Sequence, residues 1–150
     1  MVSENRRLRA GVVGAGVFGG FHASKYAAHE RADLVGIYEP NRALFDRLAS
    51  KYNIDPSLRY DNLERMLEET RPEAASVMTS IADHAGVVET CAARGVHTLV
   101  EKPLAFSASD AARIAHAARH HGVLVLTNYE TSWYASVREA KRLVDSGEMA

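Results

Sequence analysis

The sequence has few cysteines and no excess of one charge. A single cysteine, Cys91, stands among 150 residues, so no disulfide can form within the chain. This usage is typical of a reducing compartment, and we expect a cytoplasmic protein. The 18 basic and 19 acidic residues leave a formal net charge of -1, which gives no electrostatic attraction to a nucleic acid or an anionic membrane. We therefore expect neither partner.

Long apolar runs and internal repeats are also missing. The basic segment MVSENRRLRA is followed by a short apolar run that breaks into glycines, so we expect neither a signal peptide nor a membrane span. With 47% hydrophobic residues, 10 glycines and 4 prolines, the composition differs from that of disordered and fibrous proteins. It suits one globular domain that can bury a sizeable core.

Short apolar runs alternate with helical patterns along the chain. The runs predict buried strands at 8–13, 34–38, 75–78, 96–100 and 123–127, with a further short strand near 58–60. Helices are predicted at about 17–29, 41–52, 61–70, 84–94, 108–121 and 134–146. Helical crossovers make neighbouring strands parallel, so we predict an α/β domain in which a doubly wound parallel sheet has helices on both faces.

A glycine-rich turn, GVVGAGVFGGFH, follows the first predicted strand. Gly14, Gly16 and Gly19 have the spacing of a dinucleotide-binding turn, in which the glycines allow a tight turn, close approach of the pyrophosphate and helix packing, in that order. The helix N-terminus behind the turn favours an anion. We therefore predict a Rossmann-type domain whose cofactor contacts include Val17 and Phe18. The alternative is a tight turn without a ligand.

An acidic residue, Glu39, ends the next predicted strand about 20 residues beyond the last glycine of the turn. A carboxylate there can accept hydrogen bonds from the ribose of NAD and would repel the 2′-phosphate of NADP. The sequence therefore favours NAD over NADP. Arg42 lies three residues further on and is a candidate to pair with a phosphate, or else a solvated arginine at the start of a helix.

A second informative stretch is VHTLVEKPLAFSASDAARIAHAARHHGVLVLTNYE, residues 96–130. Its Glu101-Lys102-Pro103 motif ends a predicted parallel strand, at the sheet edge where open α/β sheets bind ligands. Together with the glycine turn, this block resembles the Gfo/Idh/MocA family of NAD(P)-dependent oxidoreductases, which commonly act on sugars and polyols. The similarity extends over the whole chain, through HAGVVETCAARGVHTLVEKPL to AKRLVDSGEMA.

The resemblance implies roles for several residues. Lys102 is the expected catalytic lysine, next to both the nicotinamide and the substrate hydroxyl, where it helps to move a proton. Glu101 is expected to border the cofactor, and Pro103 to follow a cis peptide bond. Further expected cofactor contacts are Thr79 and Ser80 in place of the family's Thr-Pro, His84 at the start of the next helix, and Asn128 after the last strand. The segment NYETSWYAS departs from the family, with Ser132, Trp133 and Ala135 where an arginine, an aromatic residue and a proline are common.

The family places an Asp and a His on a second domain built on an open β-sheet. We therefore interpret residues 1–150 as the dinucleotide-binding domain, with about 129–150 as the helix that leads toward an absent substrate domain. The expected function is hydride transfer between nicotinamide and a sugar or polyol hydroxyl, in a full-length homo-oligomer. Two alternatives are an NAD-dependent glycosidase of the same fold and a non-catalytic dinucleotide-binding module.

Other conspicuous residues have a structural interpretation. His116 and His120 lie one helical turn apart but share a polar face with arginines, so we expect no metal site. Cys91 has no neighbour that would activate a thiolate, and we expect a packed core thiol. Trp133 and Tyr134 are candidates either for a sugar site or for an aromatic contact where the helix leaves the domain.

Overall fold

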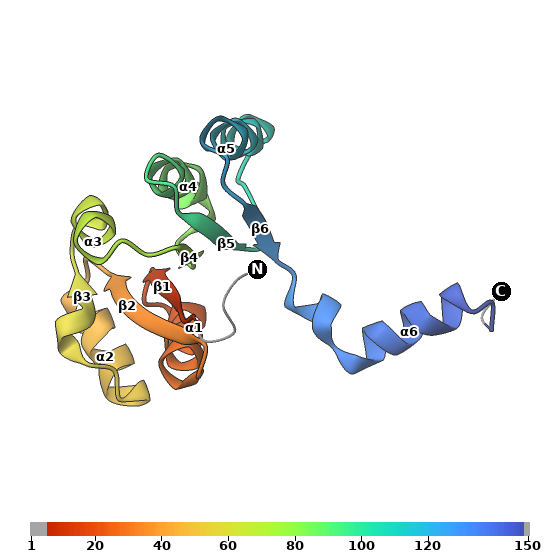
Figure 1. Ribbon diagram of the computed structural model, residues 1–150, viewed down its shortest axis with the longest axis horizontal. Coiled ribbons are helices and arrows are strands. Elements are labelled where there is room, and N and C mark those ends of the chain that lie inside the picture. The colour runs from red at the N-terminus through yellow and green to blue at the C-terminus, as the bar shows by residue number, and fades with distance from the viewer. Residues whose placement is uncertain (1–5, 149–150) are drawn as a thin grey trace.

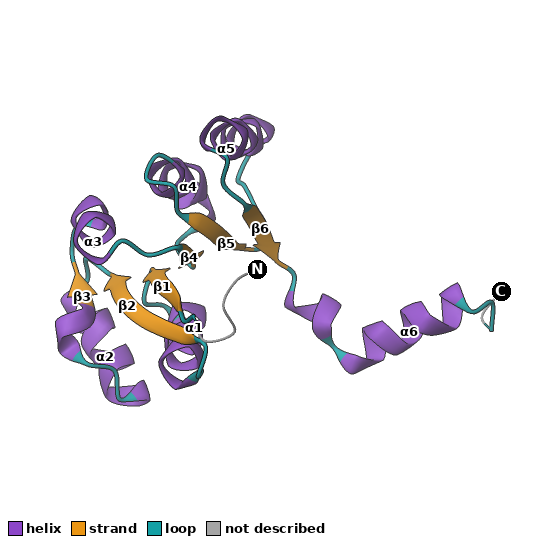
Figure 2. Ribbon diagram, in the orientation of Figure 1, coloured by secondary structure: helices purple, strands orange, loops and turns teal. Residues whose placement is uncertain are grey.

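The computed structural model describes residues 6–148, and they form an α/β domain around one parallel sheet (Figures 1 and 2). The six strands have the order β3-β2-β1-β4-β5-β6, and every neighbouring pair is parallel. The predicted doubly wound fold is therefore confirmed. The strands are β1 (Leu8–Val13), β2 (Ala32–Tyr38), β3 (Arg59–Tyr60), β4 (Ala74–Val77), β5 (His97–Glu101) and β6 (Val125–Asn128).

Helices cover the two faces of the sheet in separate groups, as Figure 1 shows. Helices α1 and α2 pack on one face, and α3, α4 and α5 pack on the other. After β3 the chain passes from one face of the sheet to the other, as a doubly wound fold requires. The helices are α1 (Val17–Ala28), α2 (Arg42–Tyr52), α3 (Leu63–Thr70), α4 (His84–Ala92), α5 (Ala108–His121) and α6 (Ala135–Asp145).

The core follows from the alternation of side chains along β1. Neighbouring residues of a strand point to opposite faces, and Val12 and Val13 are both completely buried. Val12 packs with Ile37 and Phe45 beneath α1 and α2. Val13 packs with Met66 beneath α3 and α4. The continuous apolar run in β1 thus reflects a central strand that is covered on both sides.

Local hydrogen bonds explain where several predicted boundaries shift. The helix predicted from residue 61 begins at Leu63 because the Asn62 side chain caps its N-terminus, accepting from the Arg65 backbone N–H. The strand predicted from residue 123 begins at Val125. Val123 instead donates its N–H to Ala118, closing the end of α5.

Helix α6 projects away from the rest of the domain beyond β6 (Figure 1). None of its residues is buried, and Val137 and Val144 on its surface are exposed. Leu126 on β6 and Leu124 directly before this strand are also exposed. No helix within residues 6–148 combines the length and the apolar character that crossing a membrane would demand.

Candidate functional site

The glycine turn connects β1 to α1 at the carboxyl edge of the sheet. Gly14 has a φ of +98°, and a Cβ atom added to it would lie 2.8 Å from the Met78 carbonyl oxygen. A Cβ atom on Gly19 would lie 1.9 Å from the Gly14 carbonyl oxygen. At Gly16, by contrast, an added Cβ atom would meet no atom within 4 Å. Two of the glycines are thus required by the fold, whereas the glycine between them leaves open space.

Gly16 is also the N-cap residue of α1, and no side chain caps this helix end. The first N–H groups of a helix have no partner within the helix. In α2, α3 and α5 a side chain accepts from one of these groups. The start of α1 therefore combines uncapped donors with a bare backbone, the arrangement that binds a phosphate.

Glu39 follows β2 and is almost fully buried, with 6% of its surface exposed. Its Oε2 accepts a hydrogen bond of 2.9 Å from the backbone N–H of Ala15, inside the glycine turn. Its Oε1 accepts one of 2.9 Å from the N–H of Asn41, the N-cap residue of α2. The carboxylate thus joins the turn to the start of α2, and each oxygen keeps one lone pair for a ligand.

A cleft of about 760 Å³ lies at this edge of the sheet. Gly14, Gly16, Glu39, Thr79 and Ser80 line it, so these predicted cofactor residues are brought together from three strand ends. The other predicted residues are not among its lining residues: Val17, Phe18, Gly19, Arg42, His84, Glu101, Lys102 and Asn128.

Arg42 and His84 contact other parts of the protein, and their role as cofactor contacts stays a prediction. The Arg42 side chain is 68% exposed and binds Asp46 one helical turn further on, with Nε 2.9 Å from Oδ1. This arrangement is the one expected for a solvated arginine at a helix start, the alternative given above. The His84 ring is buried, with only 1% exposure, and its Nδ1 donates to the Leu104 carbonyl oxygen over 3.2 Å. His84 thus holds the segment that follows Lys102 instead of facing the cleft.

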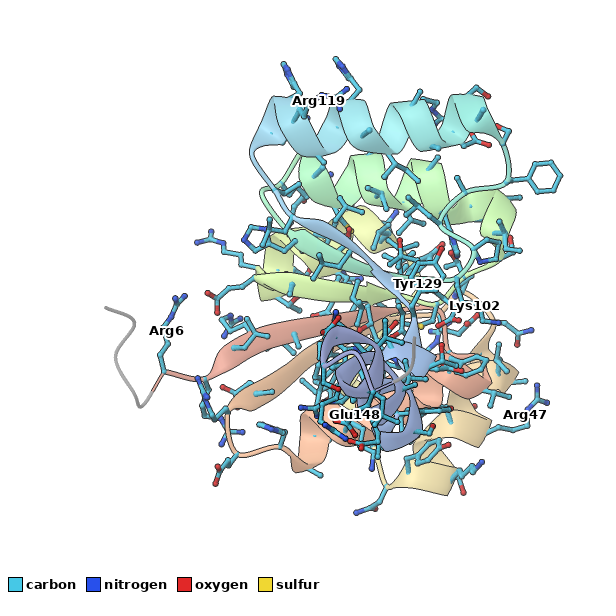
Figure 3. The ribbon with its side chains drawn as sticks, turned by 90° about the vertical axis from the view of Figure 1, so that its right-hand side faces the viewer. Arg6, Arg47, Lys102, Arg119, Tyr129 and Glu148 are labelled. Atoms are coloured by element: carbon cyan, nitrogen blue, oxygen red, sulfur yellow. The ribbon has the colours of Figure 1, made fainter. Side chains whose placement is uncertain are left out.

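Lys102 lies just beyond β5, and its side chain is exposed. The peptide bond between Lys102 and Pro103 is cis, as the resemblance implied. Figure 3 shows Lys102 and Tyr129 at the same edge of the domain. Leu104 packs against the apolar cluster that joins α4, α5 and the sheet. Packing and the His84 hydrogen bond therefore fix the turn that presents the lysine.

Contacts within a polar cluster beside this turn were not predicted from the sequence, although Glu101 and Asn128 were each named as expected cofactor contacts. The parallel register of β5 and β6 pairs Glu101 with Asn128, whose amide donates to Glu101 Oε2 over 2.8 Å. On the α1 side, His22 Nδ1 lies 3.0 Å from Ser76 Oγ, which lies 2.7 Å from the Tyr26 hydroxyl. The sequence signal for this cluster was limited to polar residues that stand in otherwise apolar elements.

The charges in this cluster influence one another. Burial lowers the pKa of His22, while the negative charges of Glu101 and Glu130 act in the opposite direction. Glu101 is 9% exposed, and its Oε1 is buried without a hydrogen-bond partner among the described residues. An unpaired buried carboxylate oxygen is energetically costly. Glu101 Oε1 could therefore accept a hydrogen bond from a ligand, in line with the predicted position of Glu101 beside the cofactor.

Two other candidates have no catalytic geometry. Cys91 is completely buried, and burial raises the pKa of its thiol to about 12. It stays protonated near neutral pH and is a core residue. His116 and His120 stack with ring centroids 5.7 Å apart. Within residues 6–148, no three His, Cys, Asp or Glu side chains are grouped so that they could hold a metal ion.

Comparison with known proteins identifies the family. The model of the Gfo/Idh/MocA family, described as "Oxidoreductase family, NAD-binding Rossmann fold", matches residues 8–129. The chain belongs to this family. The match includes the glycine turn, Glu39 and the Lys102 turn, so the resemblance inferred from the sequence motifs is confirmed.

Relatives of the chain include enzymes that act on sugars. UDP-N-acetylglucosamine 3-dehydrogenase of Acidithiobacillus ferrooxidans is 32% identical over 120 residues, which are 79% of this chain and 36% of the relative. The 2,7-anhydro-N-acetylneuraminate hydratase of Mediterraneibacter gnavus is 26% identical over 136 residues, 91% of this chain and 35% of the relative. The chain thus spans about a third of the length of these two relatives.

Among solved structures, GenD2 from gentamicin A biosynthesis in complex with NAD is similar, with a TM-score of 0.82 and 28% identity. The alignment covers 92% of this chain and 39% of GenD2. The backbone of the family's NAD-binding Rossmann domain is therefore reproduced here along nearly all of the chain.

Proposed function

We propose that this chain is the cofactor-binding half of an NAD-dependent oxidoreductase that transfers a hydride between nicotinamide and a hydroxyl group of a sugar or polyol. The observation that carries the proposal is the open space at Gly16, beside uncapped N–H groups of α1. A glycine that the fold does not need, in a turn whose other two glycines it does need, indicates a ligand that approaches the backbone closely.

The residues around the cleft fit a dinucleotide. The pyrophosphate would lie on the N–H groups at the start of α1, while a ribose would donate hydroxyl protons to the free lone pairs of Glu39. Thr79 and Ser80 line the cleft directly after β4, and the neighbouring strand β5 ends at the Lys102 turn. When bound, the cofactor supplies a nicotinamide ring that accepts or returns a hydride.

Lys102 would handle the proton that accompanies the hydride. Lys102 directly follows the parallel strand β5, at the edge of the sheet where such folds bind ligands. The turn after Lys102 is held by the His84 hydrogen bond, which restricts the positions available to the lysine side chain. In the oxidation direction, the substrate carbon loses a hydride and its hydroxyl loses a proton. A hydrogen bond from Lys102 to that oxygen favours the developing alkoxide and lets the amine share the proton.

A second domain would complete the site. Large apolar residues are exposed at intervals from the start of β6 to α6: Leu124, Leu126, Tyr129, Trp133, Tyr134, Val137 and Val144. Such a concentration of exposed apolar side chains in one segment is typical of a protein interface. Such a domain would orient the substrate and exclude water, and orientation contributes ~7–11 kcal/mol of barrier reduction. We therefore expect residues 1–150 alone to bind cofactor but not to oxidise sugars.

Calorimetric titration of NADH into the 150-residue chain tests cofactor binding. We expect Gly16→Val to weaken binding at least about tenfold, because the new side chain fills the space where the backbone meets the pyrophosphate. The variant should keep its fold, since an added Cβ atom at this site meets no neighbour. Ala27→Val is the matched control, because it adds the same branched side chain at an exposed site on α1. Unchanged affinity in a folded Gly16→Val chain would disprove the proposal.

The role of Lys102 is tested in the full-length protein that carries this domain. Lys102→Ala should lower turnover sharply while NADH binding survives, and near-normal turnover would remove the lysine from the mechanism. The relative named as a hydratase favours a second candidate, a reaction without net oxidation, such as the cleavage of glycosides with transient use of NAD. Substrate turnover without accumulation of NADH would identify that reaction. Tight NADH binding without any turnover would identify a non-catalytic module.

A further inference from the structure

Among the charged residues that line the cleft, carboxylates outnumber basic groups. Glu39, Asp61, Glu64 and Asp83 all line it, and one basic residue, Arg113, does so. The Arg113 guanidinium already binds Glu89, with Nη2 2.6 Å from Oε2, and Asp110, with Nη1 3.0 Å from Oδ1. Its charge is therefore largely compensated. The cleft presents a negative field to any ligand that carries an additional phosphate.

The titration of a tyrosine in the cleft reflects this field. Burial raises the pKa of Tyr38, and the charges of Glu39, Glu64 and Asp83 raise it further. These carboxylates belong to separate elements, at the end of β2, the first turn of α3 and the start of α4. Because all three carboxylates raise the pKa of the same tyrosine, their negative charges act together in the region around Tyr38.

Glu39 and Asp61 leave neighbouring strand ends. The register of β2 and β3 pairs Tyr38 with Tyr60, and the Glu39 N–H donates to the Tyr60 carbonyl oxygen over 2.8 Å. Asp61 is the residue that follows Tyr60, and in this register it is the neighbour of Glu39. Both therefore stand at the end of the cleft where a carboxylate distinguishes NAD from NADP.

The two carboxylates differ in how much of their charge is free. Both Glu39 oxygens accept backbone N–H groups inside the protein. The Asp61 side chain is 65% exposed, and the one ion pair recorded for it within residues 6–148 is with Arg59, at 3.8 Å. Arg59 is mostly buried, donates from Nη2 to the Pro40 carbonyl oxygen over 3.0 Å, and has no partner for its Nε in the same part of the chain.

We propose that Asp61 is a second cofactor-selecting residue, which repels the 2′-phosphate of NADP and masks the guanidinium of Arg59 behind it. This inference rests on the proposed dinucleotide function. A 2′-phosphate carries close to two negative charges, and arginine is the residue that commonly accommodates it. Asp61 acts against NADP in both ways, through direct repulsion and through its pairing with the arginine.

The test compares NADH and NADPH binding to the 150-residue chain and to Asp61→Asn. The substitution keeps the size of the side chain and removes its charge. We expect the affinity for NADPH to rise about three- to tenfold, the range for one exposed charge acting on a doubly charged phosphate. The affinity for NADH should change less than about twofold. Repeating the titrations at 1 M salt should remove most of the gain, because the Debye length falls to about 3 Å.

Asp33→Asn is the matched control. Asp33 is an exposed aspartate on β2 that pairs with Arg7 at 2.8 Å, but it lies at the opposite end of the strand. The same loss of charge there should leave both affinities unchanged. An equal gain for NADPH in both variants, an unchanged ratio in Asp61→Asn, or a salt-independent gain would overturn the inference. So would a loss of both nucleotides in Asp61→Asn, which would make Asp61 a structural residue.

The same titrations separate this inference from the proposed function. If the unaltered chain binds neither NADH nor NADPH, the proposed function fails, and the inference fails with it. If the unaltered chain binds NADH and Gly16→Val weakens that binding, the proposed function stands. The ratio of the two affinities in Asp61→Asn then decides the role of Asp61 alone.

Discussion

Replacement of Glu39 by glutamine should destabilise the domain even without a nucleotide. The buried carboxylate accepts two backbone hydrogen bonds, each of 2.9 Å, from Ala15 and Asn41. In Glu39→Gln one carboxylate oxygen becomes an NH2 group, so one backbone donor loses its acceptor and faces another donor. Hydrogen bonds to a charged group contribute about 1.5–3 kcal/mol, and at 6% exposure little solvent is available to replace one.

This free energy corresponds to a measurable change in melting temperature. For a domain of this size, 1 kcal/mol shifts Tm by about 2–4 °C, so Glu39→Gln should lower Tm by about 3–12 °C. Thermal melts of the nucleotide-free chain at neutral pH provide the assay. Glu30→Gln makes the same chemical change at an exposed residue and should change the free energy of unfolding by less than about 0.5 kcal/mol.

Melts in the presence of NADH separate the two roles of Glu39. A ligand that binds only the folded state raises its stability in proportion to the logarithm of ligand concentration over Kd. Glu39→Gln should therefore lose stability without NADH and also gain less from NADH than the unaltered chain. If the nucleotide-free variant has the same Tm as the unaltered chain, the two backbone hydrogen bonds do not stabilise the domain. Glu39 would then act only through its contact with the cofactor.

Three further substitutions test individual contacts. Gly19→Ala should prevent stable folding, as seen by circular dichroism, because its Cβ atom would lie 1.9 Å from the Gly14 carbonyl oxygen; a native-like melt would contradict this geometry. Cys91 should react with a thiol reagent at pH 8 only after denaturation, since burial raises its pKa to about 12; rapid labelling of the folded chain would contradict it. His84→Asn keeps a donor for the Leu104 carbonyl oxygen and should protect the Leu104 turn from amide exchange better than His84→Leu does; equal exchange in both variants would exclude the tether.

The order of elements could be predicted because it depends on local patterns. The apolar run of β1 and its glycines indicated a central strand, and the observed bounds of that strand, Leu8–Val13, are the predicted ones. Boundaries shifted where a hydrogen bond between side chain and backbone decides the end of an element, as at the Asn62 cap. Such a bond depends on one side-chain conformation, which the periodicity of apolar residues does not encode.

The site could be predicted only in part, because its parts depend on different kinds of contact. The glycine turn is local, so the spacing of Gly14, Gly16 and Gly19 was enough to place it. The pairing of Glu101 with Asn128 requires the register of two strands 27 residues apart. The tether between His84 and Leu104 requires the packing of α4 against the turn after β5. The family resemblance named His84 as a cofactor contact but gave no sign of its hydrogen bond to Leu104, because that bond depends on tertiary packing.

In the proposed selection of NAD over NADP, Glu39 and Asp61 have different roles. Glu39 holds the glycine turn with one oxygen and the start of α2 with the other, so a substitution there changes the local backbone contacts and the charge together. Asp61 makes no hydrogen bond to the backbone within residues 6–148, so its charge can be removed with little effect on shape. A change of preference measured at Glu39 alone would therefore combine two causes. Of these two residues, Asp61 is the one at which the charge of the cleft can be changed separately, and the salt dependence of NADPH binding measures the effect of that charge.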